Sequence, residues 1–153
     1  ALTTDVRRSA VAFFLAEFLW KTFPEEVAHP EVVDWTWRWV LELDATQHPA
    51  NVHVRYLAGL TALLGLAPES LPPSAGHGFD LSTGEYVVVD TPDEVHLSPQ
   101  GAQAFYAWTR EEEFPVNGAL RRELVLGLVH YIQLQLSGVR TLKSYEVLEA
   151  VFA

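Results

Sequence analysis

The stretch GLAPESLPPSAGHGFDLSTGEYVVVD, residues 65–90, decides the fold class because it interrupts a chain that otherwise reads as a series of amphipathic helices. Its first half contains LPPSAG at 71–76, whose paired prolines cannot propagate a helix. The second half places the turn sequence STG, at 82–84, between two short apolar segments, which is typical of a tight β-hairpin. A two-stranded hairpin is marginal on its own, so we expect an insertion at about 71–97 that packs on a helical body.

Helical periodicity flanks this insertion on both sides. Apolar residues recur at spacings of three and four, and first-turn prolines follow the expected helix starts. Ser98 and Asn117 are the predicted N-caps of the fourth and fifth helices. The expected helices cover about 5–20, 30–44, 50–66, 98–110, 117–137 and 144–152. The sequence therefore predicts a mainly α fold: a single domain over residues 1–153, built as a compact bundle of about six helices with a small β-hairpin insertion.

The composition excludes several classes of protein. A chain of 153 residues is long enough to bury a substantial core as one domain. It has no cysteine, which excludes disulfides and thiolate zinc sites. The longest unbroken apolar run, residues 10–16, is too short to span a bilayer, and no secretory leader is visible. We therefore expect a cytoplasmic protein without a membrane partner, and the missing initiator Met suggests that an N-terminal portion is absent.

The net charge of −10 argues against a strong grip on nucleic acid, because twenty acidic residues face ten Lys and Arg residues. Four of those cations open predicted helices, where a positive charge opposes the helix dipole unless something anionic lies nearby: Arg7, Arg8, Arg121 and Arg122. Pairing with the chain's own surplus of Glu and Asp is the alternative explanation. The candidates for a weak contact with DNA are Arg7, Arg8, Arg140 and Lys143.

Metal and catalytic motifs are not apparent. His48 and His53 lie five residues apart, and His77 and His96 flank the hairpin, but neither pair has a ligand spacing. The chain shows no nucleophile elbow, P-loop or GxGxxG sequence. We therefore expect no metal, no cofactor and no enzymatic activity. A hydrolase that depends on acids or histidines would require a cleft with converging ionisable groups.

The tryptophans of WTWRW, at 35–39, are either a stacking platform or part of the core. A spacing of two on a helix cannot place all three rings on one face, so packing is the favoured interpretation. Trp37 is predicted to be buried, and Trp35 and Trp39 to be partly exposed beside Arg38. The residues assigned to the buried side are Val33, Trp37, Val40 and Leu41.

Four segments in order, LGLAPE, FDLSTGEYV, LSPQGAQAF and LKSYEVLEAVF, resemble the C-terminal region of RecO, the recombination mediator family. The resemblance covers essentially the whole chain and implies an N-terminal OB-fold domain that this chain lacks. Many family members carry a four-cysteine zinc module at the insertion, so this chain resembles the cysteine-free branch with a bare hairpin. The resemblance also implies a non-enzymatic adaptor of recombinational repair that binds single-stranded DNA-binding protein and RecR. Such an adaptor anneals complementary strands, helps to load RecA, and contacts DNA mainly through the missing domain.

The resemblance places Arg55 at the arginine-aromatic position where the acidic C-terminal tail of single-stranded DNA-binding protein docks. Such a tail ends in a hydrophobic residue and a carboxylate, which call for an apolar pocket with a planar cation at its mouth. Arg55, Tyr56 and Leu60 are expected to supply both, with Arg121 and Arg122 next in line. A surface ion pair is the alternative role of Arg55. The competing function is a helical small-molecule-binding domain of a transcription repressor, which the hairpin and the LKS sequence disfavour.

Overall fold

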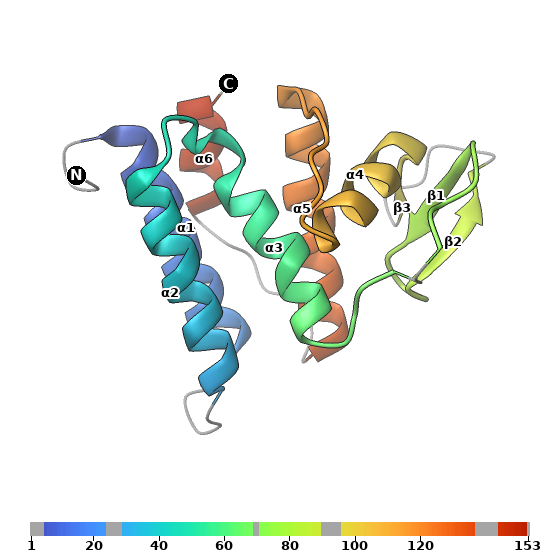
Figure 1. Ribbon diagram of the computed structural model, residues 1–153, viewed down its shortest axis with the longest axis horizontal. Helices are drawn as coiled ribbons and strands as arrows, with labels where there is room; N and C mark the ends of the chain where they lie inside the picture. The colour runs from blue at the N-terminus through green and yellow to red at the C-terminus, as the bar shows by residue number, and fades with distance from the viewer. Residues whose placement is uncertain (1–4, 24–28, 69–70, 90–95, 137–143, 153) are drawn as a thin grey trace.

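The computed structural model confirms a mainly helical chain with a small antiparallel sheet at one end (Figure 1). It describes residues 5–23, 29–68, 71–89, 96–136 and 144–152. The helices in these ranges are α1 (Val6–Thr22), α2 (Pro30–Ala45), α3 (Val52–Leu63), α4 (Pro99–Thr109), α5 (Gly118–Leu136) and α6 (Ser144–Phe152), and Pro49–Asn51 forms a 3-10 turn before α3. The strands are β1 (His77–Asp80), β2 (Glu85–Val88) and β3 (His96–Leu97).

The predicted N-caps of α4 and α5 are confirmed. The Ser98 hydroxyl accepts the Gly101 N–H at 3.0 Å, and the Asn117 side chain accepts the Leu120 N–H at 2.8 Å. The Glu123 carboxylate in turn accepts hydrogen bonds from the Ser98 N–H and hydroxyl. Each cap satisfies a backbone donor that the first helical turn leaves unpaired. The start of α4 is thereby tied to α5.

The sheet has three strands in the order β2-β1-β3, which corrects the expected two-stranded hairpin. β1 pairs antiparallel with β2, as the hairpin pattern predicted, and the structure places Phe79 opposite Tyr86. It also pairs antiparallel with β3, where Phe79 faces Leu97. A two-residue strand carries too little periodicity to be recognised in a sequence. Its pairing covers the second edge of β1, which an isolated hairpin would leave open.

The hairpin turn is fixed by its own side chains. The Asp80 carboxylate accepts the Ser82 N–H at 2.8 Å and the Thr83 N–H at 3.2 Å. Gly84 follows with a φ of +74°, a conformation that glycine adopts without strain. Burial alone raises the pKa of Asp80, but these hydrogen bonds, together with nearby His96, hold it below its ordinary value. The side chain of Asp80 and the conformation of Gly84 therefore define the turn.

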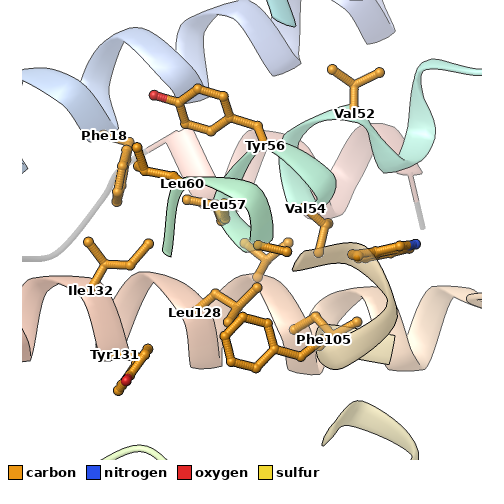
Figure 2. Close-up of a cluster of buried hydrophobic side chains, with 14 of the residues drawn as sticks. Phe18, Val52, Val54, Tyr56, Leu57, Leu60, Phe105, Leu128, Tyr131 and Ile132 are labelled. Carbon is orange, nitrogen blue, oxygen red and sulfur yellow. The ribbon is translucent and has the colours of Figure 1, made fainter. Parts of the chain in front are cut away.

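Helix α3 lies at the centre of the bundle and contacts α1, α2, α4 and α5. Figure 2 shows how its buried side chains meet those of α1, α4 and α5. The sheet joins this core through Phe79, whose ring centroid lies 5.1 Å from that of Phe105 and 5.2 Å from that of Tyr131. The labelled core side chains are Phe18, Val52, Val54, Tyr56, Leu57, Leu60, Phe105, Leu128, Tyr131 and Ile132. The insertion is thus part of the hydrophobic core.

The predicted buried side of α2 is wrong. Trp37 is 63% exposed, whereas Trp39 is only 6% exposed. The inward face of α2 consists of Val32, Trp39 and Leu43, a spacing of seven and four residues, while Val33 and Leu41 lie outside. Large apolar residues surround this helix on most sides, so their periodicity allows two different faces to be the buried one. Packing against α1 and α3 buries the face that contains Trp39.

Candidate functional site

A small pocket lies where α3 and α6 meet the first turns of α5. We call it the α5 pocket. Its volume is about 30 Å³, which corresponds to roughly two water molecules. A carboxylate group fits such a space, whereas an aromatic ring would have to rest on its open rim. The lining residues are His53, Gly118, Arg121, Arg122, Val125, Leu148, Glu149 and Phe152.

Arg121 supplies the positive charge of the α5 pocket. Its Nε donates a hydrogen bond to the Asn51 side-chain oxygen at 2.8 Å, and its guanidinium carbon lies 5.9 Å from the centroid of the Phe152 ring. Within the described part of the chain, no carboxylate pairs with it. Partial burial lowers the pKa of Arg121, but an arginine remains protonated at neutral pH. The first turn of α5 contains no acidic residue, so the positive end of its dipole adds to this field.

His53 forms the buried wall of the α5 pocket. Its ring lies between Phe14, at 5.7 Å and edge to face, and Phe152, at 5.9 Å and stacked. The residue is 1% exposed, and its Nδ1 has no hydrogen-bond partner among the described residues. Burial, with a smaller effect of the Arg121 charge, lowers the pKa of His53 to about 3. The imidazole is therefore neutral at physiological pH.

The remaining ionisable groups at the α5 pocket pair with each other. Arg122 Nε lies 2.8 Å from a Glu149 carboxylate oxygen. No Ser, Thr, Tyr or Asp side chain is among the described residues that line the pocket. His53 is also a very weak base, because its pKa is about 3. This arrangement suits the binding of an anion and offers no nucleophile with an activating base.

The other predicted partner-binding residues lie elsewhere. Tyr56 and Leu60 have no exposed surface, so neither side chain is available to a docked peptide in this structure. The Tyr56 hydroxyl is 2.8 Å from the Thr36 hydroxyl, and burial raises the pKa of Tyr56 to about 12. Arg55 is partly exposed and lies over the Trp39 ring, 5.4 Å from its centroid, in a cation–π contact. No carboxylate among the described residues forms the alternative surface ion pair with it.

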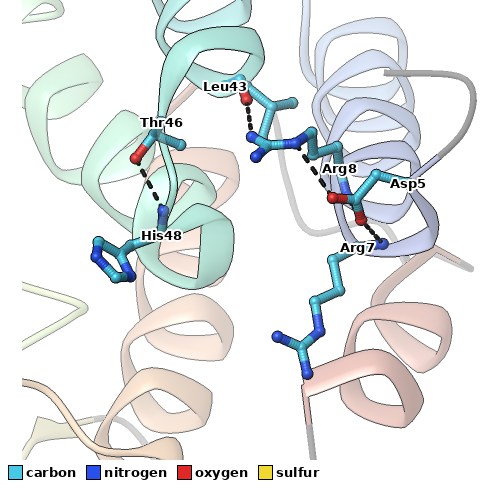
Figure 3. Close-up of polar contacts among 6 residues, drawn as sticks. All are labelled: Asp5, Arg7, Arg8, Leu43, Thr46 and His48. Carbon is cyan, nitrogen blue, oxygen red and sulfur yellow. Dashed lines mark hydrogen bonds and ion pairs between the residues drawn. The ribbon is translucent and has the colours of Figure 1, made fainter. Parts of the chain in front are cut away.

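The cations proposed for DNA contact also differ from one another (Figure 3). Arg8 Nε pairs with the Asp5 carboxylate at 3.2 Å, and its Nη1 donates to the Leu43 carbonyl in the last turn of α2. Arg8 is therefore a structural link between α1 and α2. Arg7 is exposed, and its side chain points away from this network. Arg140 and Lys143 lie outside the described residues.

The structure thus brings Arg121 and Arg122 together with a residue that the sequence analysis treated only as a metal candidate. His53 belongs to the run VHVRYLAGL, where a lone histidine between valines signals a buried polar group. That signal was visible in the sequence. Its position opposite Arg121 depends on how α3 and α5 pack, which the sequence does not show.

Comparison with known proteins identifies the family. Residues 3–146 match the family model described as Recombination protein O C terminal. The chain belongs to this family. The match confirms the resemblance inferred from the hairpin and the LKSYEVLEAVF segment, and it disfavours the transcription-repressor alternative.

Relatives from several bacteria carry the name DNA repair protein RecO. That of Phocaeicola vulgatus is 27% identical over 160 residues, which cover 99% of this chain and 66% of the relative. That of Bacteroides fragilis is 29% identical over 157 residues, covering 97% and 64%, respectively. That of Christiangramia forsetii is 27% identical over 159 residues, covering 99% and 65%. The chain thus spans just under two thirds of the length of the RecO proteins it matches. No solved structure matches it.

None of the helices formed by the described residues is long and apolar enough to cross a membrane. No group of three or more His, Asp or Glu side chains is placed to hold a metal ion within these residues.

Proposed function

We propose that this chain is the helical domain of a non-enzymatic mediator of recombinational DNA repair. We also propose that the α5 pocket docks the acidic C-terminal tail of single-stranded DNA-binding protein. The proposal of this docking site depends on Arg121. Its guanidinium is partly buried and has no carboxylate partner in the described part of the chain, although the net charge of the chain is −10. A cation kept unpaired among twenty acidic residues is available to a ligand that supplies the anion.

The chemistry of the α5 pocket suits a peptide that ends in a hydrophobic residue. The space of about 30 Å³ admits the terminal carboxylate beside Arg121. The last side chain would rest on the partly exposed Phe152 ring, behind which Val125 and Leu148 are buried. This arrangement joins a charge-assisted hydrogen bond to apolar burial, which together provide both affinity and orientation. Arg122 contributes less, because Glu149 already neutralises it.

A titration with two matched peptides tests the docking site. One peptide copies the acidic tail with a free C-terminal carboxylate, and the other is identical except for a C-terminal amide. Arg121→Ala should weaken binding of the free acid by about 10- to 150-fold, because a hydrogen bond to a charged group contributes roughly 1.5 to 3 kcal/mol. Binding of the amide should be weak in both proteins. Calorimetry or fluorescence anisotropy supplies the dissociation constants.

Two further variants locate the site. Arg55→Ala distinguishes the α5 pocket from the surface of Arg55 and Trp39, which the family resemblance favours. Arg110→Ala is the matched control, since Arg110 pairs with Glu112 and does not line the α5 pocket. Affinity lost in the Arg55 variant and retained in the Arg121 variant would move the site to α2 and α3. Equal affinity of all variants would reject both positions.

The remaining partners are proposed for the longer protein. RecR interaction, strand annealing and RecA loading would involve the rest of the chain as well as this domain. DNA contact by this domain should be weak, because Arg8 is engaged in the structure and Arg7 alone offers little charge. Submicromolar binding of single-stranded DNA that resists added salt would contradict this part of the proposal.

A further inference from the structure

His53 combines three properties that a purely structural residue rarely shows together. It is 1% exposed, it lines the α5 pocket, and its Nδ1 has no hydrogen-bond partner in the part of the chain that the structure describes. A buried polar atom without a partner destabilises the folded state, because water no longer solvates it. The two flanking rings, Phe14 and Phe152, would accommodate an apolar side chain at least as well. The unpaired nitrogen therefore requires an explanation outside the free domain.

We propose that His53 is a specificity-determining residue of the α5 pocket, and that its neutral imidazole donates a hydrogen bond from Nδ1 to the carboxylate of the bound ligand. This inference rests on the proposed function of the pocket as a docking site for an acidic peptide. Arg121 then supplies the charge, and His53, which lines the same pocket, supplies a second, directional donor. A carboxylate has two oxygens, so it can accept from both at once.

The groups around His53 keep its ring neutral. Burial is the main cause of the lowered pKa of His53, and the charge of Arg121, which lies on α5, further disfavours a second cation. Glu149 of α6 is paired with Arg122, so it gives little compensating field. The contact from α1 is the Phe14 ring, which carries no charge. Recognition by a neutral donor predicts that affinity for the peptide stays constant between pH 5.5 and 8, an interval in which the terminal carboxylate stays ionised.

His53→Phe is the decisive variant. It keeps an aromatic ring in contact with Phe14 and Phe152 and removes both ring nitrogens. We expect the free-acid peptide to bind about 3- to 10-fold more weakly, which is the usual effect of one neutral hydrogen bond. We also expect the free domain to melt about 2–4 °C higher, because the variant buries no unsatisfied atom. His48→Phe, at an exposed position, is the matched control and should change neither quantity.

A second measurement uses the wild-type chain labelled with ¹⁵N. The Nδ1 resonance of His53 should shift when the free-acid peptide or sodium acetate is added, and it should not shift with sodium chloride or the amidated peptide. A shift with acetate but not with the peptide would reject the docked tail and keep the carboxylate contact. If neither carboxylate changed the Nδ1 chemical shift, the inference would be overturned, even if His53→Phe failed to fold.

The remaining outcomes separate the two proposals. Wild-type binding that His53→Phe leaves unchanged would overturn the role of His53 while keeping the docking site. A lower melting temperature of that variant, with unchanged affinity, would show that His53 is structural. Affinity that rises on acidification with a midpoint near pH 6 would show a charged imidazolium and overturn the neutral donor.

Discussion

Phe79→Ala should show that the small sheet is held to the helices by aromatic packing. Phe79 is fully buried, and its ring lies edge to face with Tyr86 at 5.9 Å, Phe105 at 5.1 Å and Tyr131 at 5.2 Å. Replacing a buried phenylalanine by alanine costs about 3–5 kcal/mol. Aromatic pairs add about 0.5–1.5 kcal/mol each beyond burial, and we therefore exclude the lower end of that range and expect a loss of unfolding free energy of about 4 kcal/mol.

Urea unfolding followed by circular dichroism measures this loss. With a slope of about 2 kcal/mol per molar urea, the midpoint should fall by about 2 M, and the melting temperature by about 8–16 °C. Val88→Ala is the matched control in the neighbouring strand, because Val88 is 63% exposed and should change the stability by less than about 0.5 kcal/mol. A midpoint shift below about 0.5 M for Phe79→Ala, with an unchanged slope, would refute the view that the sheet belongs to the core.

Three further predictions concern α2, the link between α1 and α2, and the buried histidine. Trp39→Ala should cost about 3–5 kcal/mol in urea unfolding, whereas Trp37→Ala, on the exposed side of α2, should stay within about 0.5 kcal/mol. Arg8→Ala should cost about 1–2 kcal/mol in the same assay, since it removes a charged donor to an α2 carbonyl, and Arg7→Ala should be neutral. Burial lowers the pKa of His53 from 6.5 to about 3, so the unfolded chain takes up a proton below pH 6.5 that the folded chain excludes. Stability should therefore fall by up to about 1.4 kcal/mol per pH unit from pH 6 to 4, relative to His53→Phe.

Local signals predicted the boundaries of the fold well. The caps at Ser98 and Asn117 and the turn after Asp80 each depend on hydrogen bonds within three residues. Such bonds are encoded by neighbouring residues, so no tertiary information is needed. The third strand, at 96–97, could not be predicted in this way. It exists because Leu97 pairs with Phe79, eighteen positions earlier in the chain.

Sequence periodicity was a poor guide to α2, for a physical reason. Trp35 packs across Gly59 of α3, where a Cβ atom would lie only 2.3 Å from its ring. That close approach, together with burial of Trp39, fixes the rotation of the helix and leaves Trp37 outside. A small residue on the neighbouring helix α3 therefore determines which face of α2 is buried. The pattern of α2 alone contains no information about Gly59.

The candidate site was predictable in its charges and unpredictable in its geometry. Arg121 was recognised because a cation in a first helical turn calls for an anion. Its buried neighbour His53 lies 68 positions away in the sequence, and the stacking of Phe152 on that ring comes from the last helix. Arg55 and Tyr56 are adjacent in the sequence, yet α3 exposes the first in part and buries the second completely. Side-chain direction on a helix, more than distance along the chain, decided which residues share the pocket.

The arginines differ in whether a carboxylate pairs with them, and this difference points to the candidate site. The structure describes seven of them, and four pair with a carboxylate: Arg8, Arg38, Arg110 and Arg122. With twenty acidic residues in the chain, an arginine on the surface meets a carboxylate easily, so the absence of a partner is informative. Among the described arginines that lack one, Arg7 is exposed and Arg55 lies on a tryptophan ring. Arg121 differs from both, because it is half-buried beside an apolar rim and faces a histidine whose Nδ1 is also unpaired. Within the described residues, one pocket thus holds a guanidinium without a carboxylate and a buried imidazole nitrogen without a hydrogen-bond partner, and a bound carboxylate would pair with both.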